Sequence, residues 1–496
     1  MSETERTSTG SVIKNFLWRL AERAGAQGVK LLVELALAQV LLPKEYGLIA
    51  MVTVFITVFN VFVDSGLGNA LIQKKDADEL DFASVFWFNV VWCVVLYGIL
   101  YLTAPMLAGL YKHDYRHEEL CLVLRVLGLQ IIISGVKNVY QAYVSRTMQF
   151  RKFFFATLGG TLGAAAIGIT MAYRGYGVWA LVAQQLFNVL TDTVILCLVV
   201  KWHPKRMFSF ERLKGLLSYG WKLLLSALID TIYNEARTFI IGTRYTEDDL
   251  AFYNRGEQFP QVIAANVNTS IDSVLLPTMS REQDERTKVR AMTRRAIMTS
   301  TYIMAPLMIG LACISLQLVG ALLPERWIPC VPYLRIFCAG MLFYPIHTAN
   351  LNAIKAMGRS DVYLKLEILK KVVGIILILI TMHISVAAMA LSTLVNSLLC
   401  QIINSWPNRK LLDYRYKDQI LDILPNILMA AFMGACVWGI GKLPLPDWAI
   451  LLIQIPAGAA IYAGLSAAFK NESFAYLLSV LKKVLKRTTG STEAGE

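Results

Sequence analysis

The stretch ASVFWFNVVWCVVLYGILYLTAPMLAGL, residues 83–110, decides the fold class, because it contains no charged residue. A helix needs ~20 mostly apolar residues to cross a bilayer, and this stretch is longer than that. The whole chain has a similar character: 56% of its 496 residues are hydrophobic and 17% are charged, against ~25% charged in soluble domains. The composition excludes a soluble globular enzyme and a disordered or fibrous chain. It predicts an all-α polytopic membrane protein.

On both sides of this stretch, apolar runs alternate with short polar links and predict fourteen transmembrane helices. The predicted spans are 14–42, 46–72, 83–110, 118–145, 153–173, 177–200, 213–242, 249–276, 291–322, 330–354, 361–383, 386–407, 420–441 and 447–469. After the last span, ESFAYLLSVLKKVLKR (472–487) has apolar residues at helical spacing and a basic end. This pattern is typical of an amphipathic helix lying in the membrane interface.

The basic residues are distributed unevenly over the predicted loops. Of the 48 Lys and Arg residues, 29 fall on the side of the N-terminus, 7 on the opposite side, and 12 in or near the spans. Because cytoplasmic loops carry the excess of Lys and Arg, we predict that both termini are cytoplasmic. This asymmetry also explains most of the net charge of +13 without a nucleic-acid partner.

An internal repeat of about 208 residues relates two halves of six helices each. This shift aligns Val63-Asp-Ser-Gly-Leu67 with Ile271-Asp-Ser-Val-Leu275, and Asn188 with Asn396. An even number of helices per half gives the halves parallel topology. The predicted domains are an N-terminal tail (1–13), a first six-helix bundle (14–200), a basic linker (201–212), a second bundle (213–410), two further helices (411–470) and an amphipathic basic tail (471–496).

Cysteines and glycines indicate packing rather than chemistry. The eight cysteines lie in or at the ends of apolar stretches and form no CxxC pair, which is typical of buried free thiols. We expect no disulfide framework, no metal site and no cofactor. The run Gly159-Gly-Thr-Leu-Gly163 follows no strand, so it predicts close helix packing rather than a phosphate-binding loop.

Five motifs in the chain resemble polysaccharide exporters and lipid-linked oligosaccharide flippases of the Wzx type, a branch of the superfamily that also contains the MATE drug exporters. They are Leu41-Leu-Pro-Lys-Glu-Tyr-Gly-Leu, Val144-Ser-Arg-Thr-Met-Gln-Phe-Arg-Lys, Gly177-Val-Trp-Ala-Leu-Val-Ala-Gln-Gln-Leu, Phe252-Tyr-Asn-Arg-Gly-Glu-Gln-Phe and Val274-Leu-Leu-Pro-Thr-Met-Ser-Arg. The resemblance covers residues 10 to 410. It implies two six-helix bundles in a V that move an undecaprenyl-diphosphate-linked glycan outward by alternating access. It carries no catalytic signature to transfer.

Ionisable residues within the predicted spans are the candidates for function, because charge inside a membrane is costly. A diphosphate head group needs cationic donors. The predicted substrate-binding residues are Arg23, Lys30, Lys137, Lys222, Asn234 and Arg237. The predicted ion-coupling residues are Asp64, Asp230, Glu235 and Asp272. The alternatives are snorkelling of the basic side chains, structural ion pairs between helices, and, for Asp64 and Asp272, capping or pairing with loop arginines.

Three functions compete at this point. The first is a non-enzymatic flippase of the bacterial inner membrane, working as a monomer with a lipid-linked oligosaccharide, membrane lipids and a polymerase or export machinery as partners. The second is a MATE-type cation-coupled multidrug exporter, which would need an acidic cavity, whereas the first helix is mainly basic. The third is a membrane glycosyltransferase, which normally needs a large extramembrane loop that this sequence lacks.

Overall fold

The computed structural model describes residues 28–64, 66–111, 116–147 and 149–479. These residues form α-helices with one 3-10 helix and no strand. Residues 28–40 are helical, and the numbered elements that follow are α2 (Pro43–Asp64), α3 (Leu67–Gln73), α4 (Glu79–Ala108), α5 (His117–Leu127), α6 (Leu129–Arg146), α7 (Phe150–Tyr173), α8 (Val178–Val199), α9 (Phe210–Arg244), α10 (Glu247–Arg281), α11 (Arg286–Leu322), η2 (Glu325–Cys330), α12 (Val331–Met341), α13 (Tyr344–Ala356), α14 (Ser360–Thr381), α15 (Val386–Ser405), α16 (Asn408–Leu411), α17 (Tyr416–Ile440) and α18 (Asp447–Ala468).

Within the described residues, nine helical segments are long and apolar enough to cross a membrane, so the prediction of an all-α multi-pass membrane protein is confirmed. They correspond to nine of the fourteen predicted spans. The predicted spans 153–173, 213–242, 249–276 and 361–383 are also helical, as α7, α9, α10 and α14, but are not among the nine. Charged residues interrupt α9, α10 and α14. The span 14–42 lies partly outside the described residues, and the count of fourteen stays a prediction.

Three predicted spans are each broken into two helices. The span 46–72 divides at Gly66, which has a φ of 69°; glycine adopts this left-handed conformation readily. The span 118–145 divides at Gly128 between α5 and α6. The span 330–354 divides before α13, and Pro345 stands in the first turn of that helix, where a missing N–H costs no helical hydrogen bond.

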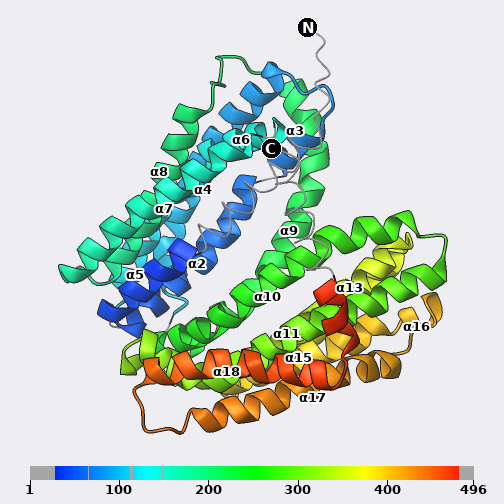
Figure 1. Ribbon diagram of the computed structural model, residues 1–496. Helices are drawn as coiled ribbons and strands as arrows, with labels where there is room; N and C mark the ends of the chain where they lie inside the picture. The colour runs from blue at the N-terminus through cyan, green and yellow to red at the C-terminus, as the bar shows by residue number, and fades with distance from the viewer. Residues whose placement is uncertain (1–27, 65, 112–115, 148, 480–496) are drawn as a thin grey trace, which may run out of the picture. The chain divides into compact units, whose positions relative to one another are not determined.

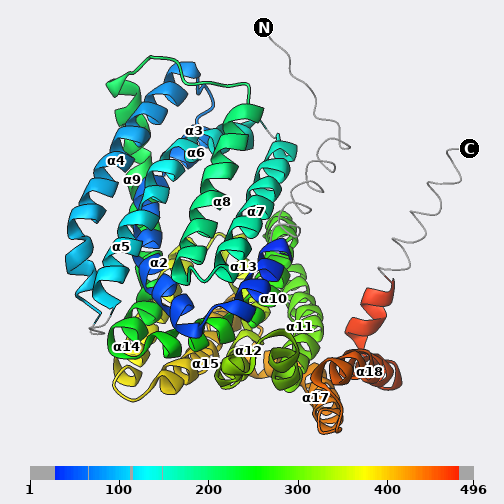
Figure 2. The same ribbon diagram turned by 90° about the vertical axis from the view of Figure 1, so that its left-hand side faces the viewer.

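The chain divides into two compact units, Met1–Ala251 and Phe252–Glu496. In the first unit α7 packs along α8, α6 contacts α4 and α8, and α2 contacts α9; Figure 2 shows α7 and α8 side by side. By contacts, α9 therefore belongs with the first unit. The sequence repeat assigns the same residues to the second bundle, and the division into six-helix bundles remains a prediction.

In the second unit α11 is the central helix. It contacts α12, α13, α17 and α18, while α15 packs against α12, α13 and α14. Figure 1 shows α17 and α18 running along α11 in orange. A short helix, residues 472–479, follows α18 and is the described part of the predicted amphipathic tail. The two helices outside the repeat thus pack against α11 and against each other.

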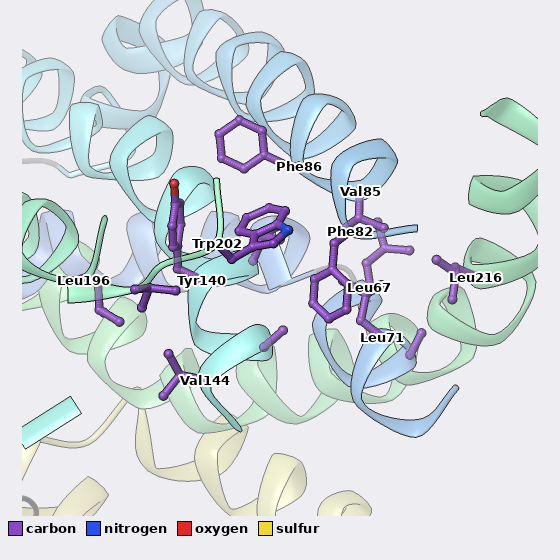
Figure 3. Packing of buried hydrophobic residues seen from close by; sticks show 14 of the residues in the cluster. Leu67, Leu71, Phe82, Val85, Phe86, Tyr140, Val144, Leu196, Trp202 and Leu216 are labelled. Atoms are coloured by element: carbon purple, nitrogen blue, oxygen red, sulfur yellow. The ribbon is translucent and has the colours of Figure 1, made fainter. Parts of the chain in front are cut away.

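An aromatic cluster holds the first unit together where the segment after α8 returns. Trp202 is 8% exposed and its ring centroid lies 5.3 Å from that of Tyr140, 5.8 Å from Phe82 and 6.2 Å from Phe86. Figure 3 shows the indole between Tyr140 and the two phenylalanines. These edge-to-face contacts anchor the basic linker to α4 and α6.

A buried polar group joins α17 to the rest of the second unit. Asn350 on α13 donates to the Gln419 Oε1 atom on α17 (2.9 Å), and Ser405 on α15 donates to the same oxygen (2.9 Å). Asn408 on α16 donates to the Asn350 Oδ1 atom (2.7 Å). Interhelical hydrogen bonds of this kind take the place of the hydrophobic effect as glue between helices in lipid.

Candidate functional site

An ion pair inside the first unit joins Lys137 on α6 to Asp192 on α8. Their side chains are 21% and 10% exposed, respectively. The second carboxylate oxygen of Asp192, Oδ1, is buried and has no hydrogen-bond partner in the described structure. The amine of Lys137 is therefore the main group that compensates the buried charge of Asp192.

A second carboxylate lies near the same amine. Asp64 is the last residue of α2, and the Lys137 ammonium attracts its carboxylate electrostatically. The next residue of α6, Asn138, donates to the carbonyl oxygen of Val63 (3.3 Å) and so fixes α6 against the end of α2. One amine thus lies among two carboxylates from two other helices, an arrangement we call the Lys137 cluster (Asp64, Lys137 and Asp192).

Glycines of α7 allow α8 to place Asp192 in this cluster. A Cβ atom on Gly160 would lie 3.1 Å from the carbonyl oxygen of Asn188 and 3.3 Å from the Asp192 Cβ atom. A Cβ atom on Gly163 would lie 2.7 Å from the ring of Phe187. The predicted close packing of the run 159–163 is confirmed. Because these glycines have no side chain, α8 can approach α7 closely.

A polar face of α9 carries three of the predicted residues. Asp230, Asn234 and Arg237 are spaced by four and three residues, so they share one side of the helix. Asp230 and Asn234 are exposed, and Arg237 is half-buried. The Nε and Nη2 atoms of Arg237 are buried without a hydrogen-bond partner in the described part of the chain. A half-buried arginine with two unused donors is suited to bind an anion.

Glu235 lies on a different side of α9 from Arg237. It is half-buried and acts electrostatically on the Tyr111 hydroxyl, which donates to the carbonyl oxygen of Met51 (3.0 Å). Burial raises the pKa of the Tyr111 phenol, and the Glu235 carboxylate raises it further. The ring of Tyr111 packs against Phe55 and Phe239, so Glu235 stands beside an aromatic group.

The remaining predicted cations have different surroundings. The side chain of Lys30 is 71% exposed and lies 3.7 Å from the Glu34 carboxylate, one helical turn away. Lys222 is exposed on α9. Arg23 lies outside the described residues. The substrate-binding role of all six residues stays a prediction.

Asp272, the repeat counterpart of Asp64, has a different environment. It lies within α10 and lines a cavity of about 240 Å³ with Asn268 on α10 and Thr348 and Lys355 on α13. The difference follows from the sequence. The shift of 208 residues puts Val274 where the first half has Gly66, so α10 continues where α2 ends.

Asp192, the most deeply buried member of the Lys137 cluster, was not among the residues predicted from the sequence. The signal was present, since Asp192 is the only charged residue between Gly177 and Val200. Its partner Lys137 was identified as a substrate cation, whereas the structure shows it compensated by a carboxylate.

Comparison with known proteins places the fold among membrane transporters. A family model described as "Polysaccharide biosynthesis protein" matches residues 36–332. The teichuronic acid biosynthesis protein TuaB of Bacillus subtilis is 26% identical over 311 residues, covering 62% of this chain and 63% of TuaB, just under two thirds. The lipopolysaccharide biosynthesis protein WzxC of Escherichia coli is 20% identical over 457 residues, covering 88% of this chain and 90% of WzxC.

Several solved structures share the fold. The lipid II flippase MurJ in an inward closed conformation has a TM-score of 0.74 and 15% identity, with 92% of this chain and 98% of MurJ covered. A multidrug resistance MATE family transporter of the MOP superfamily, in an inward-facing conformation, has a TM-score of 0.60 and 15% identity, with 78% and 94% covered. The predicted MATE-like helical fold is confirmed, with the higher score for the flippase.

Proposed function

Because this chain belongs to the polysaccharide biosynthesis protein family, whose model spans more than half of it, we propose that it is a flippase. Its substrate is an undecaprenyl-diphosphate-linked oligosaccharide or a polysaccharide precursor, which it moves across the bacterial inner membrane by alternating access. The observation that carries the proposal is the pair of buried, unused donors of Arg237, Nε and Nη2, set on a helix with a polar face, in a fold shared with a lipid II flippase.

The cations divide into two roles. Arg237 binds the diphosphate, since its Nε and Nη2 donors are unused and arginine binds such oxygens bidentately. Asn234, one turn away, contacts sugar hydroxyls. Lys30 and Lys222 attract the diphosphate as exposed point charges. Lys137 contributes less to binding because Asp192 already neutralises it.

The carboxylates supply the coupling to an ion gradient. In the Lys137 cluster, a proton or cation taken up by Asp64 or Asp192 weakens the hold on Lys137 and so changes how α2, α6 and α8 are joined. Asp230, Glu235 and Asp272 are the further coupling candidates. The energy of breaking a buried ion pair, ~3–5 kcal/mol, is comparable with the few kcal/mol that separate alternative conformations.

The same proposal includes the setting. The excess of basic residues in one set of loops favours cytoplasmic N- and C-termini. The protein works as a monomer, alongside a polymerase or export machinery that consumes the flipped precursor, and it catalyses no covalent step.

A flipping assay in proteoliposomes tests the proposal. The substrate is a fluorescent lipid-diphosphate oligosaccharide, and the variant is Arg237→Gln. Loss of a charge-assisted hydrogen bond of ~1.5–3 kcal/mol lowers the flipping rate at least about tenfold. Arg174→Gln is the matched control, because Arg174 is exposed just after α7; it leaves the rate unchanged.

The assay also separates the alternative of a MATE-type cation-coupled multidrug exporter, whose fold likeness is weaker. If the wild-type chain does not flip the lipid but moves a cationic dye against a proton or sodium gradient, the flippase proposal is wrong. If the lipid is flipped equally by wild type and Arg237→Gln, the role of Arg237 is wrong and the flippase proposal stands.

A further inference from the structure

A cavity in the second unit shares no residue with the candidate site. It has a volume of about 540 Å³ and is lined by residues of α11, of α17 and of the helix 472–479, together with Tyr414, two residues before α17. Its charged lining consists of Arg290, Arg294, Arg295, Asp418, Asp422 and Glu472. A volume of this size falls in the range of small-ligand pockets. We call it the α11–α17 pocket.

The pocket lies where the helices change from polar to apolar. In α11 the charged residues end at Arg295, and residues 296–322 contain none. In α17 they end at Asp422, and residues 423–440 contain none. Met298 and Thr299, one turn beyond Arg295, form the apolar end of the lining. The pocket is therefore at the level of lipid head groups, just outside the hydrocarbon core.

Not all the arginines are available to a ligand. Arg294 makes a bidentate pair with Asp422 (2.8–3.0 Å), and Tyr414 donates to the same carboxylate (2.7 Å). These three side chains already bond to one another, so they contribute one side of the pocket but are not available to a ligand. Arg290 has only a 3.5 Å contact with Asp413, whose side chain is 80% exposed.

Arg295 is the cation without a carboxylate partner. Its guanidinium lies over the ring of Tyr476, 5.2 Å from the centroid, and no ion pair joins it to a carboxylate within the described ranges of the chain. Stacking on an aromatic ring holds the planar group while its N–H donors remain free. Arg295 and Arg290 both line the pocket and thus offer donors to a phosphate bound in it.

The acidic side chains determine which phosphate compound fits. Asp418 and Glu472 line the same pocket, and Asp418 uses only its Oδ2 atom, to accept from the backbone N–H of Arg415 (3.2 Å). Outside the Arg294–Asp422 pair, two carboxylates and two arginines balance the charge of the lining. A doubly charged diphosphate or an anionic lipid would leave the carboxylates uncompensated, whereas a head group with one phosphate and one ammonium can pair with both the arginines and the carboxylates.

We propose that the α11–α17 pocket binds the phosphoethanolamine head group of a membrane phospholipid. The phosphate accepts hydrogen bonds from Arg295 and Arg290, the ammonium donates to Glu472 and Asp418, and the acyl chains leave past Met298 into the bilayer. The helix 472–479 forms one wall through Ser473 and Tyr476, so the bound lipid fastens this helix to α11 and α17. The site is independent of the substrate site and of transport.

Native mass spectrometry on the full-length chain in detergent tests this. The purified protein is offered equal amounts of short-chain phosphatidylethanolamine and phosphatidylglycerol. Wild type retains one phosphatidylethanolamine with about a tenfold preference, as expected for one additional charge-assisted hydrogen bond. Arg295→Gln reduces retention of both lipids about tenfold. Glu472→Gln removes the preference while phosphatidylglycerol binding is retained.

A control variant and three outcomes decide whether the assignment holds. Arg409→Gln removes an exposed arginine of the same unit outside the pocket and leaves retention unchanged. Equal or better binding of phosphatidylglycerol by wild type overturns the assignment, as does Glu472→Gln with an unchanged preference. Displacement of the lipid by millimolar inorganic phosphate shows a phosphate site rather than a lipid site.

Discussion

The Lys137 cluster makes an asymmetric prediction about stability. Lys137→Met leaves two carboxylates, Asp64 and Asp192, without their shared cation, and the Asp192 Oδ1 atom already lacks a partner. Asp192→Asn leaves Lys137 with the attraction of Asp64. Removing one partner of a buried pair costs ~3–5 kcal/mol. Because the side chains are 21% and 10% exposed, we expect the low end, about 3 kcal/mol, for Lys137→Met and about half of that for Asp192→Asn.

The double variant separates the ion pair from other effects. Lys137→Met combined with Asp192→Asn removes both charges of the pair, so its cost of about 2 kcal/mol is below the sum of the single costs. Equilibrium unfolding in mixed micelles with increasing sodium dodecyl sulfate, followed by tryptophan fluorescence, measures all three. The matched control is Lys205→Met, which breaks the exposed pair with Glu79 (62% and 43% exposed) and costs about 1 kcal/mol or less.

Two results would refute this reasoning. The first is a cost for Lys137→Met no larger than that for Lys205→Met, which would mean that water or lipid head groups solvate the cluster. The second is additivity of the two single costs in the double variant, which would mean that the amine and carboxylate act independently.

Three further predictions concern helix packing and one ion pair. Gly160→Leu separates α7 from α8, because its side chain meets a backbone oxygen at 3.1 Å; it lowers the melting temperature in detergent, while Gly98→Leu, with nothing within 4 Å of its added Cβ, does not. Trp202→Ala costs about 3–5 kcal/mol of unfolding free energy, measured by the same micelle titration, and a cost below 1 kcal/mol would contradict the packing shown in Figure 3. Arg294→Lys loses the bidentate pair with Asp422 and costs about 1 kcal/mol in the same micelle titration, since the arginine side chain is half exposed; Arg294→Leu should cost more.

Much of the fold was predictable because membrane helices are determined by local composition. The length of each apolar run and the polar residues that interrupt it predicted nine of the segments that are long and apolar enough to cross a membrane in the described part of the chain. This works because each membrane helix satisfies its own backbone hydrogen bonds. The breaks at Gly66 and Gly128 were not predicted, because glycine is common within membrane helices and only tertiary packing decides where it ends one.

The candidate site was less predictable, for a physical reason. The sequence shows that Lys137 and Asp192 are charged within spans, but pairing between α6 and α8 is a long-range contact. The depth of Asp192 depends on glycines of a third helix, α7. Arg237 was identified from its charge alone, whereas its unused donors are visible only in the folded chain.

The polar group that joins α17 to the second unit has a consequence for biosynthesis. Asn350 and Ser405 leave the ribosome before Gln419, so during insertion they lack the amide to which both donate. The Asn350 amide keeps its hydrogen bond to the Ile346 carbonyl oxygen of its own helix (3.0 Å), but the hydroxyl of Ser405 gains its acceptor on Gln419 only when α17 is inserted. Polar groups that lack a partner are costly in hydrocarbon, so we expect a chain truncated before Tyr416 to insert less completely than the full chain.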